Sequence, residues 1–273
     1  MTLPRAVIEA GYKPASQLNL RGLMLKINGL PDGGKTELAL SGPGPGVCVL
    51  SDRGYKGMLR NPSPPQTRNP DIWLKTVEFP SDKDPGAAQE LFVRAWNAYR
   101  AEVYTALALG GISTVVVDGD SDTWDIQKLA HYGKKTQIPP MMWESANSTR
   151  KAMLTRCQDS GKVVIVTSKM KKHYADVLDT NGIICLDDSG KPKREWDGTY
   201  DASGYNDQGY FWEVEVLAMK HDAKSEWGLQ IQKNKSDPGY VGQELWGDEC
   251  NLKTLFQFIF PHIDINSWGQ WSY

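Results

Sequence analysis

Short runs of apolar residues recur along this chain and are separated by segments of helical character. Four runs are apolar at nearly every position, namely 23–27 (LMLKI), 47–50 (VCVL), 114–117 (TVVV) and 163–167 (VVIVT), and the stretch 72–79 alternates. Continuous apolar runs of this length are typical of strands that are buried on both faces. The pattern therefore predicts an α/β fold with a mainly parallel central sheet.

Helices are expected between these strands. The first, at 36–40, must be short because SGPGPG at 41–46 ends it. The clearest spans 85–109, has apolar residues near helical spacing and ends at Gly110-Gly111. Two more are expected, at about 123–131 and at 144–160. Helices in these positions would cover both faces of the sheet.

The pattern changes after residue 185. The segments 211–219 (FWEVEVLAM) and 227–233 (WGLQIQK) are joined by a polar turn, and they predict antiparallel strands near the C-terminus. We divide the chain into an N-terminal arm at 1–20, a core at 21–240 and a C-terminal extension at 241–273 that packs on the core.

A phosphate-binding loop follows the first strand. The sequence GLPDGGKT, from Gly29 to Thr36, matches G-x-x-x-x-G-K-S/T in full. Glycines let successive backbone N–H groups point at phosphate oxygens, the lysine neutralises the β- and γ-phosphates, and the threonine hydroxyl binds Mg²⁺. ATP and Mg²⁺ are therefore the expected cofactors. The residues predicted to contact them are Gly29, Pro31, Asp32, Gly33, Gly34, Lys35, Thr36 and Glu37.

A carboxylate ends the fourth strand. Asp118 follows TVVV, where P-loop proteins place the acid that orients Mg²⁺ and its water; Asp120 and Asp122 could share this role. Gly119 follows directly, so no glutamate is available there as a catalytic base. Asp52, at the end of a strand expected beside the phosphate-loop strand, is the candidate base. The alternative is that Asp52 begins a surface turn.

The order of these motifs resembles the RecA-like ATPases, and more closely the phage-encoded AAA-type nucleotide-binding proteins, a group that includes single-strand annealing recombinases. The resemblance covers about residues 20–240. It implies that Asp52 activates water, although members often have glutamate there. It also implies that Ser168 or Thr167, in VVIVTSKMKK, senses the γ-phosphate. Lys233 and Lys235, in LQIQKNK, would reach the nucleotide of a neighbouring subunit, or would simply face solvent on a strand.

Two basic stretches are candidates for binding nucleic acid, because the resemblance implies DNA contacts on loops after the fourth and fifth strands. The first contains Lys134 and Lys135 beside His131 and Tyr132, and the second contains Lys169, Lys171 and Lys172 beside His173 and Tyr174. Lysines neutralise phosphates and aromatic rings stack on bases. The alternative is ordinary solvated loops. With a net charge of −2 and a pI near 6.1, any such contact must be local.

These expectations combine into an ATP- and Mg²⁺-binding ATPase that acts on single-stranded DNA in phage recombination, annealing or repair. It would form a homo-oligomer in the cytoplasm of an infected bacterium, with a single-strand DNA-binding protein as a candidate partner. No apolar run approaches the roughly 20 residues of a membrane span. One alternative is a nucleotide-dependent structural or regulatory phage protein that binds a protein and no DNA. Another, a small-molecule kinase, predicts an arginine-rich lid that the sequence does not show.

Overall fold

A sheet of nine strands forms the centre of the protein. The computed structural model describes residues 22–51, 68–80, 88–134, 142–180, 182–205, 209–221, 224 and 226–271. In this part of the chain the strands lie in the order β3-β2-β4-β5-β1-β7-β8-β9, and β6 pairs with β5 outside that path. Their bounds are β1 Leu23–Gly29, β2 Gly46–Leu50, β3 Ile72–Thr76, β4 Thr114–Asp118, β5 Val163–Asp176, β6 Arg194–Ala202, β7 Val214–His221, β8 Glu226–Asn234 and β9 Glu244–Trp246.

The predicted α/β class is confirmed. Strands β1 to β5 and β7 pair in parallel, whereas β8 and β9 continue the sheet in antiparallel fashion toward the C-terminus. The helices are α2 Lys35–Ala39, α4 Gln89–Ala108, α5 Asp120–Tyr132, α6 Trp143–Asp159 and α7 Leu252–Ile259, with 3-10 turns at Pro238–Tyr240, Gly247–Glu249 and Ile265–Trp268. None of these helices is long and apolar enough to cross a membrane.

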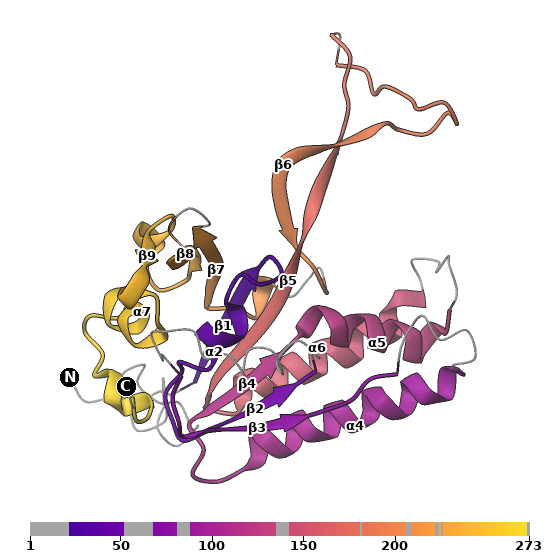
Figure 1. The fold of residues 1–273 in the computed structure, drawn as a ribbon. Coiled ribbons are helices and arrows are strands. Elements are labelled where there is room, and N and C mark those ends of the chain that lie inside the picture. The colour runs from indigo at the N-terminus through magenta and orange to yellow at the C-terminus, as the bar shows by residue number, and fades with distance from the viewer. Residues whose placement is uncertain are drawn as a thin grey trace, which may run out of the picture.

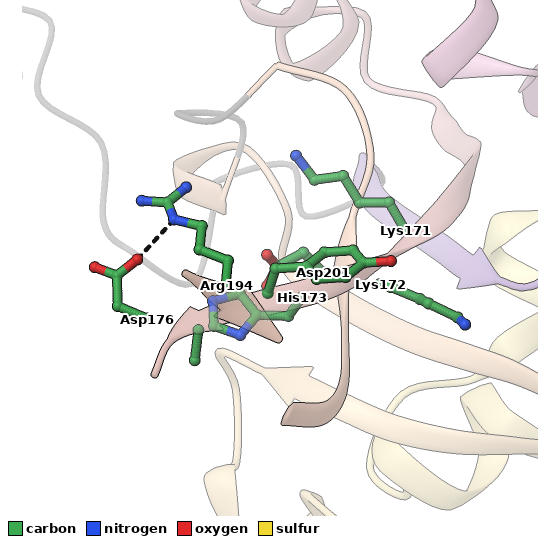
Figure 2. Close-up of a pocket in the computed structure, with 8 residues that line it drawn as sticks. Lys171, Lys172, His173, Asp176, Arg194 and Asp201 are labelled. Carbon is green, nitrogen blue, oxygen red and sulfur yellow. Dashed lines mark hydrogen bonds and ion pairs between the residues drawn. The ribbon is translucent and has the colours of Figure 1, made fainter. Parts of the chain in front are cut away.

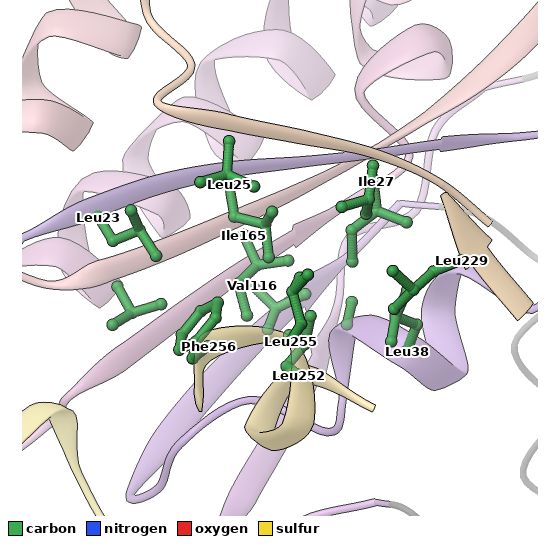
Figure 3. Close-up of a cluster of buried hydrophobic side chains, with 14 of the residues drawn as sticks. Leu23, Leu25, Ile27, Leu38, Val116, Ile165, Leu229, Leu252, Leu255 and Phe256 are labelled. Atoms are coloured by element: carbon green, nitrogen blue, oxygen red, sulfur yellow. The ribbon is translucent and has the colours of Figure 1, made fainter. Parts of the chain in front are cut away.

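Hydrophobic cores lie on both faces of the sheet, which explains why β1, β2, β4 and the first part of β5 are apolar at nearly every position. Successive side chains of a strand point to opposite faces. In β1, Leu25 belongs to a core with α2 and α7, and Met24 belongs to a core with α4, α5 and α6. Figure 3 shows Leu252 and Phe256 of α7 packed beneath the sheet. Buried contacts of this kind, together with the β8–β9 pairing, attach the described residues after 241 to the rest of the sheet.

The fifth strand differs from the prediction. It does not end at Thr167 but runs to Asp176, and beyond the sheet it pairs with β6. The two strands form a ribbon that projects from the body of the molecule (Figure 1). We call β5 from Lys169, β6 and the residues between them the arm. The prediction that Lys169, Lys171 and Lys172 lie in a loop was therefore wrong, because β6 supplies hydrogen-bond partners that the local sequence does not reveal.

The second strand is also placed differently. It pairs with β3 and β4, and β1 lies between β5 and β7. The expectation that β2 adjoins the phosphate-loop strand was wrong, because β4 and β5 both enter between them. Asp52 itself and the N-terminal arm at 1–20 lie outside the described residues.

A buried ion pair joins α5 to α6, and its removal is expected to destabilise the fold. Arg150 and Asp120 have side chains that are 0% and 1% exposed, and their charged groups are in contact. Arg150 also donates to the Thr123 hydroxyl at 3.0 Å. Changing Arg150 to alanine would leave the Asp120 charge buried without its partner, which should lower the free energy of unfolding by about 3–5 kcal/mol.

Urea denaturation measures this loss. Arg156→Ala is the matched control, because Arg156 lies exposed on the same helix and contacts the ring of Tyr104 at 4.5 Å. It should lower stability by about 1 kcal/mol or less. Equal losses for the two variants would contradict the assignment of a special role to the buried pair.

Candidate functional site

The phosphate loop connects β1 to α2. Gly29 is the last residue of β1, and the loop tightens through a hydrogen bond from Gly33 N to Leu30 O at 3.1 Å. Gly34 has a φ of 81°, a left-handed conformation that favours glycine. At Gly29 a Cβ atom would lie 2.8 Å from Ala218 O, so β7 approaches too closely for any side chain. The glycines of the motif are thus required by the backbone path.

The side chains of the loop have defined partners. Lys35 Nζ donates to Leu30 O at 2.7 Å, across the mouth of the loop. Glu37, predicted to contact the nucleotide, accepts hydrogen bonds from Arg68 Nε at 2.7 and 2.8 Å. Pro31 and Asp32 are exposed at the loop's tip. The lysine is therefore at the loop, whereas Glu37 is held by an ion pair beside it.

The structure brings together the end of β4 and the phosphate loop. The hydroxyl of Thr36 lies 3.0 and 3.2 Å from the two carboxylate oxygens of Asp118. Thr167 Oγ1 also donates to Asp118, at 2.6 Å, and accepts from Gly119 N at 2.9 Å. Asp118 is 2% exposed, so these donors replace the water that burial removes.

This set of oxygens suits Mg²⁺. The ion prefers oxygen ligands and is usually bound through one or two carboxylates together with substrate phosphates. Thr36 and Asp118 provide a hydroxyl and a carboxylate in contact at the phosphate loop. Among the described residues no group of three or more His, Cys, Asp or Glu side chains could hold a metal. A magnesium ion here would thus depend on phosphate oxygens as well as on the protein.

The residues after Asp118 are hydrogen-bonded to the root of the arm, by which we mean the part of the ribbon nearest the body of the molecule. Asp120 accepts from Ser168 Oγ at 3.3 Å, Ser121 Oγ accepts from Lys169 N at 2.9 Å, and Asp122 pairs with Lys169 Nζ at 2.8 Å. Ser168 therefore faces Asp120 and not the carboxylate at the phosphate loop. Of the two predicted sensors, Thr167 is the one that contacts Asp118, because adjacent residues of a strand point to opposite faces.

A buried lysine interacts with Asp120, and no pattern in the sequence had singled it out. Lys26 in β1 is 1% exposed and its Nζ lies 5.7 Å from the ring centroid of Trp212. Burial lowers the pKa of its ammonium, while the negative charges of Asp120 and Glu215 act in the opposite direction. Lys26 thus adds a second cation, besides Arg150, to the buried surroundings of Asp120.

One face of the arm combines a lysine with aromatic rings. Lys172 Nζ lies 4.6 Å from the ring centroid of Trp196, and that ring lies 5.6 Å from Tyr200. Trp196 is 44% exposed, and Tyr174, which pairs with it across the ribbon, is 51% exposed. The sequence interpretation missed Trp196 and Tyr200 because it did not predict β6. In the sequence, the two aromatic residues themselves were the only indication of this surface.

A groove of about 870 Å³ runs along the arm. Figure 2 shows its lining, which consists of Lys171, Lys172, His173, Tyr174, Ala175, Asp176, Arg194 and Asp201. The groove contains lysines and an arginine, and carboxylates offset part of their positive charge. Arg194 Nε, for example, lies 2.7 Å from an Asp176 carboxylate oxygen. The hydrogen bond that His173 Nδ1 donates to the Asp197 carboxylate raises the pKa of His173. Lys171 and Lys172 are exposed, so they are the clearest cations of the groove.

The other predicted residues are scattered. Lys134 is exposed after α5, and Lys135 lies outside the described residues. Tyr132 is buried and donates to Met142 O, so it does not offer a ring for stacking. Lys235 Nζ donates to Tyr210 O at 2.7 Å, and Lys233 Nζ lies 3.6 Å from Glu215.

Lys233 and Lys235 flank Asn234, which pairs with Val214, and Val214 pairs in turn with Leu25. Leu25 lies near the beginning of β1, whereas the phosphate loop begins where β1 ends. The two lysines are thus at the opposite end of the sheet from the phosphate loop of the same chain. Any contact with a nucleotide would have to be made in a neighbouring subunit.

Comparisons with known proteins found similarity to solved structures. No protein-family model matches the sequence, and no curated protein matches it either. The crystal structure of the RadB recombinase is similar over 82% of this chain and 86% of that chain, with a TM-score of 0.43 and 14% sequence identity.

Replacing Thr167 with valine is expected to lower the affinity for Mg²⁺, so that nucleotide binding requires a higher Mg²⁺ concentration. The change keeps the shape of the side chain but removes the hydroxyl that donates to Asp118 at 2.6 Å. Residues that orient a metal-binding carboxylate typically change metal affinity by about 10- to 100-fold. Titrating Mg²⁺ at fixed ATP, with calorimetry as the readout, should show a shift in this range. Unchanged Mg²⁺ dependence would indicate that Thr167 has only a packing role.

Proposed function

We propose that this protein is a RecA-like ATPase that binds ATP with Mg²⁺ and acts on single-stranded DNA through its arm. The observation that carries the proposal is the contact between Thr36 and Asp118 at 3.0 Å. It unites a complete phosphate-loop motif with a carboxylate from a different strand. A glycine-rich turn that matched the motif by chance would not be expected to have such a partner.

Each residue of the site has a proposed task. Lys35 would leave Leu30 O and bind the β- and γ-phosphates. Thr36 would bind Mg²⁺ directly, and Asp118 would hold a water molecule bound to the ion. The bound Mg²⁺ would offset the charge of the phosphates. Thr167 would keep the Asp118 carboxylate in place and lie near the γ-phosphate as its sensor. Asp52 remains the proposed base for the attacking water.

Single-stranded DNA is the proposed partner of the arm's root. The backbone phosphates would contact Lys171 and Lys172, and the bases would stack on Trp196 and Tyr174. Lys169, also predicted to bind nucleic acid, already pairs with Asp122 at 2.8 Å and contributes less free charge. The protein is otherwise acidic overall, so a local cationic and aromatic surface is needed for this contact.

The nucleotide would influence the arm through the segment 118–122. Asp118 contacts the phosphate loop, and the next residues contact the arm's root through Ser168 and Lys169. A shift of this segment on nucleotide binding would therefore be transmitted to Lys171 and Lys172. On the resemblance alone, we add a homo-oligomer in the cytoplasm of a phage-infected bacterium, with Lys233 and Lys235 acting across subunits and a single-strand DNA-binding protein as candidate partner.

A second candidate function is supported by the tip of the arm. Four large apolar side chains there are 44–64% exposed, namely Leu178, Ile183, Ile184 and Leu186. Asp187 and Asp188 lie beside them. A surface of exposed apolar side chains suits a protein partner. A nucleotide-dependent regulatory or structural phage protein that binds a protein through this tip is therefore the alternative.

Replacing Lys35 with alanine is expected to abolish ATP hydrolysis. Losing the cation that contacts the phosphates should lower kcat by about 100-fold or more, as for other charge-stabilising groups. ATP turnover is measured with and without single-stranded DNA for the native protein and for the variant. DNA should stimulate the native enzyme only. Hydrolysis by Lys35→Ala at the native rate, with an unchanged melting temperature, would refute the nucleotide site.

Replacing Lys171 and Lys172 together with glutamine is expected to weaken single-strand binding. Removing two phosphate contacts should reduce the slope of log K against log salt by about 1.4. Fluorescence anisotropy of a labelled oligonucleotide measures this slope. The control is Lys191→Gln with Lys193→Gln, the same charge change nearer the tip, which should leave the slope unchanged. If the native protein does not bind DNA at low salt, the protein-binding alternative is favoured.

A further inference from the structure

A lysine that the sequence interpretation did not select lies beside the phosphate loop. Strand β7 pairs in parallel with β1, and the register places Ala218 opposite Gly29. There β1 ends and the loop begins, whereas β7 continues through Met219 and Lys220 to His221. The last residues of β7 therefore extend past the end of β1 on the side of the loop.

The side chain of Lys220 lies on the same face of the sheet as α2. Residues two apart in a strand point to the same face, so Lys220 shares the face of Ala218. Ala218 belongs to the hydrophobic core that contains Leu38 of α2. Because the loop leads from β1 into α2, Lys220 is on the face toward which the loop turns. Lys220 is exposed, so its ammonium is not buried in that core.

A tryptophan connects this lysine to the loop. Trp227 in β8 pairs directly with Lys220 across the β7–β8 ladder. Its indole lies against Gly34, where an added Cβ would be only 2.8 Å from the ring carbon Cε3. The Nζ of Lys220 lies 5.1 Å from the centroid of the same ring. One ring thus contacts both the phosphate loop and the ammonium.

We propose that Lys220 is a second phosphate-binding cation, supplied by the same chain as Lys35. This inference rests on the proposed nucleotide site and adds a residue to it. A triphosphate carries more negative charge than one lysine offsets, and a second ammonium at the loop would bind it through charge-assisted hydrogen bonds. The cation–π contact with Trp227 restricts the long side chain beforehand, so less conformational entropy is lost on binding.

The role makes a prediction about which part of the ligand matters. Lys220 contacts the β- and γ-phosphates, so its loss should weaken the binding of nucleoside di- and triphosphates. The binding of AMP, which lacks these phosphates, should change little. A purely structural role in the hairpin would change all three ligands alike or lower the melting temperature. The comparison of the three ligands therefore separates phosphate binding from support of the fold.

Lys220→Gln is the test, with Lys224→Gln as the matched control on the same hairpin. Calorimetry with Mg²⁺ measures binding of the slowly hydrolysed analogue ATPγS, of ADP and of AMP. We expect the dissociation constants of ATPγS and ADP to rise about 10-fold in Lys220→Gln, with AMP within about 2-fold of native. Trp227→Leu should show a smaller loss in the same direction. Values for Lys220→Gln equal to those of Lys224→Gln would overturn the proposal.

Lys35→Ala in the same experiment separates the two hypotheses. If Lys35→Ala binds ATPγS as the native protein does, or if the native protein binds none of the ligands, the nucleotide site itself is refuted and Lys220 with it. If Lys35→Ala loses binding while Lys220→Gln matches its control, only the role of Lys220 is refuted. Thermal melting of each variant verifies that the chain is folded.

Discussion

The hydrogen bond between Thr36 and Asp118 joins the start of α2 to the end of β4, and α2 follows β1, which is not a neighbour of β4 in the sheet. Strand β5 lies between β1 and β4, so the phosphate loop and the carboxylate meet beside it. Thr167, within β5, donates to Asp118 at 2.6 Å. The buried carboxylate needs these donors, since an unpaired charge in a dry interior is very unfavourable. The position of β5 in the sheet therefore sets both the surroundings of the Thr36–Asp118 contact and the direction in which the arm leaves the body.

This arrangement places buried charges close to the site. Asp120 follows Asp118 by two residues and is neutralised by Arg150, with Lys26 nearby. Replacing such a pair by apolar residues is often neutral or even stabilising in other proteins, so its presence need not reflect stability. Its position suggests another reason for it: the pair fixes the start of α5, which holds Ser168 and Lys169 at the arm's root. A rigid segment transmits a small displacement better than a mobile one does.

The sequence predicted the features that depend on local patterns. Continuous apolar runs identified the parallel strands, and the glycines with Lys35 and Thr36 identified the phosphate loop. It did not predict those that depend on distant pairing. The residues from Lys169 to Asp176 are mostly polar and become a strand only because β6 pairs with them. The order of the strands in the sheet could not be predicted either. Strands that are consecutive in the chain need not be adjacent in the sheet, which is why β2 was wrongly placed beside β1. Lys26 stood within an apolar run, so its burial gave no separate signal.

The distribution of charge along the arm separates two kinds of contact. Near the root, exposed Lys171 and Lys172 line the groove and Lys172 lies beside Trp196, whereas the tip exposes apolar side chains, with acids such as Asp187 and lysines such as Lys191 close by. A polyanion would be attracted to the first surface, whereas the second suits a protein. The two functions considered for this protein, binding of single-stranded DNA and binding of a protein, thus need not compete for one surface. Among the described residues of the arm, those bonded to the segment after Asp118 lie at its root, so a displacement of this segment would reach the cationic surface before it reached the tip.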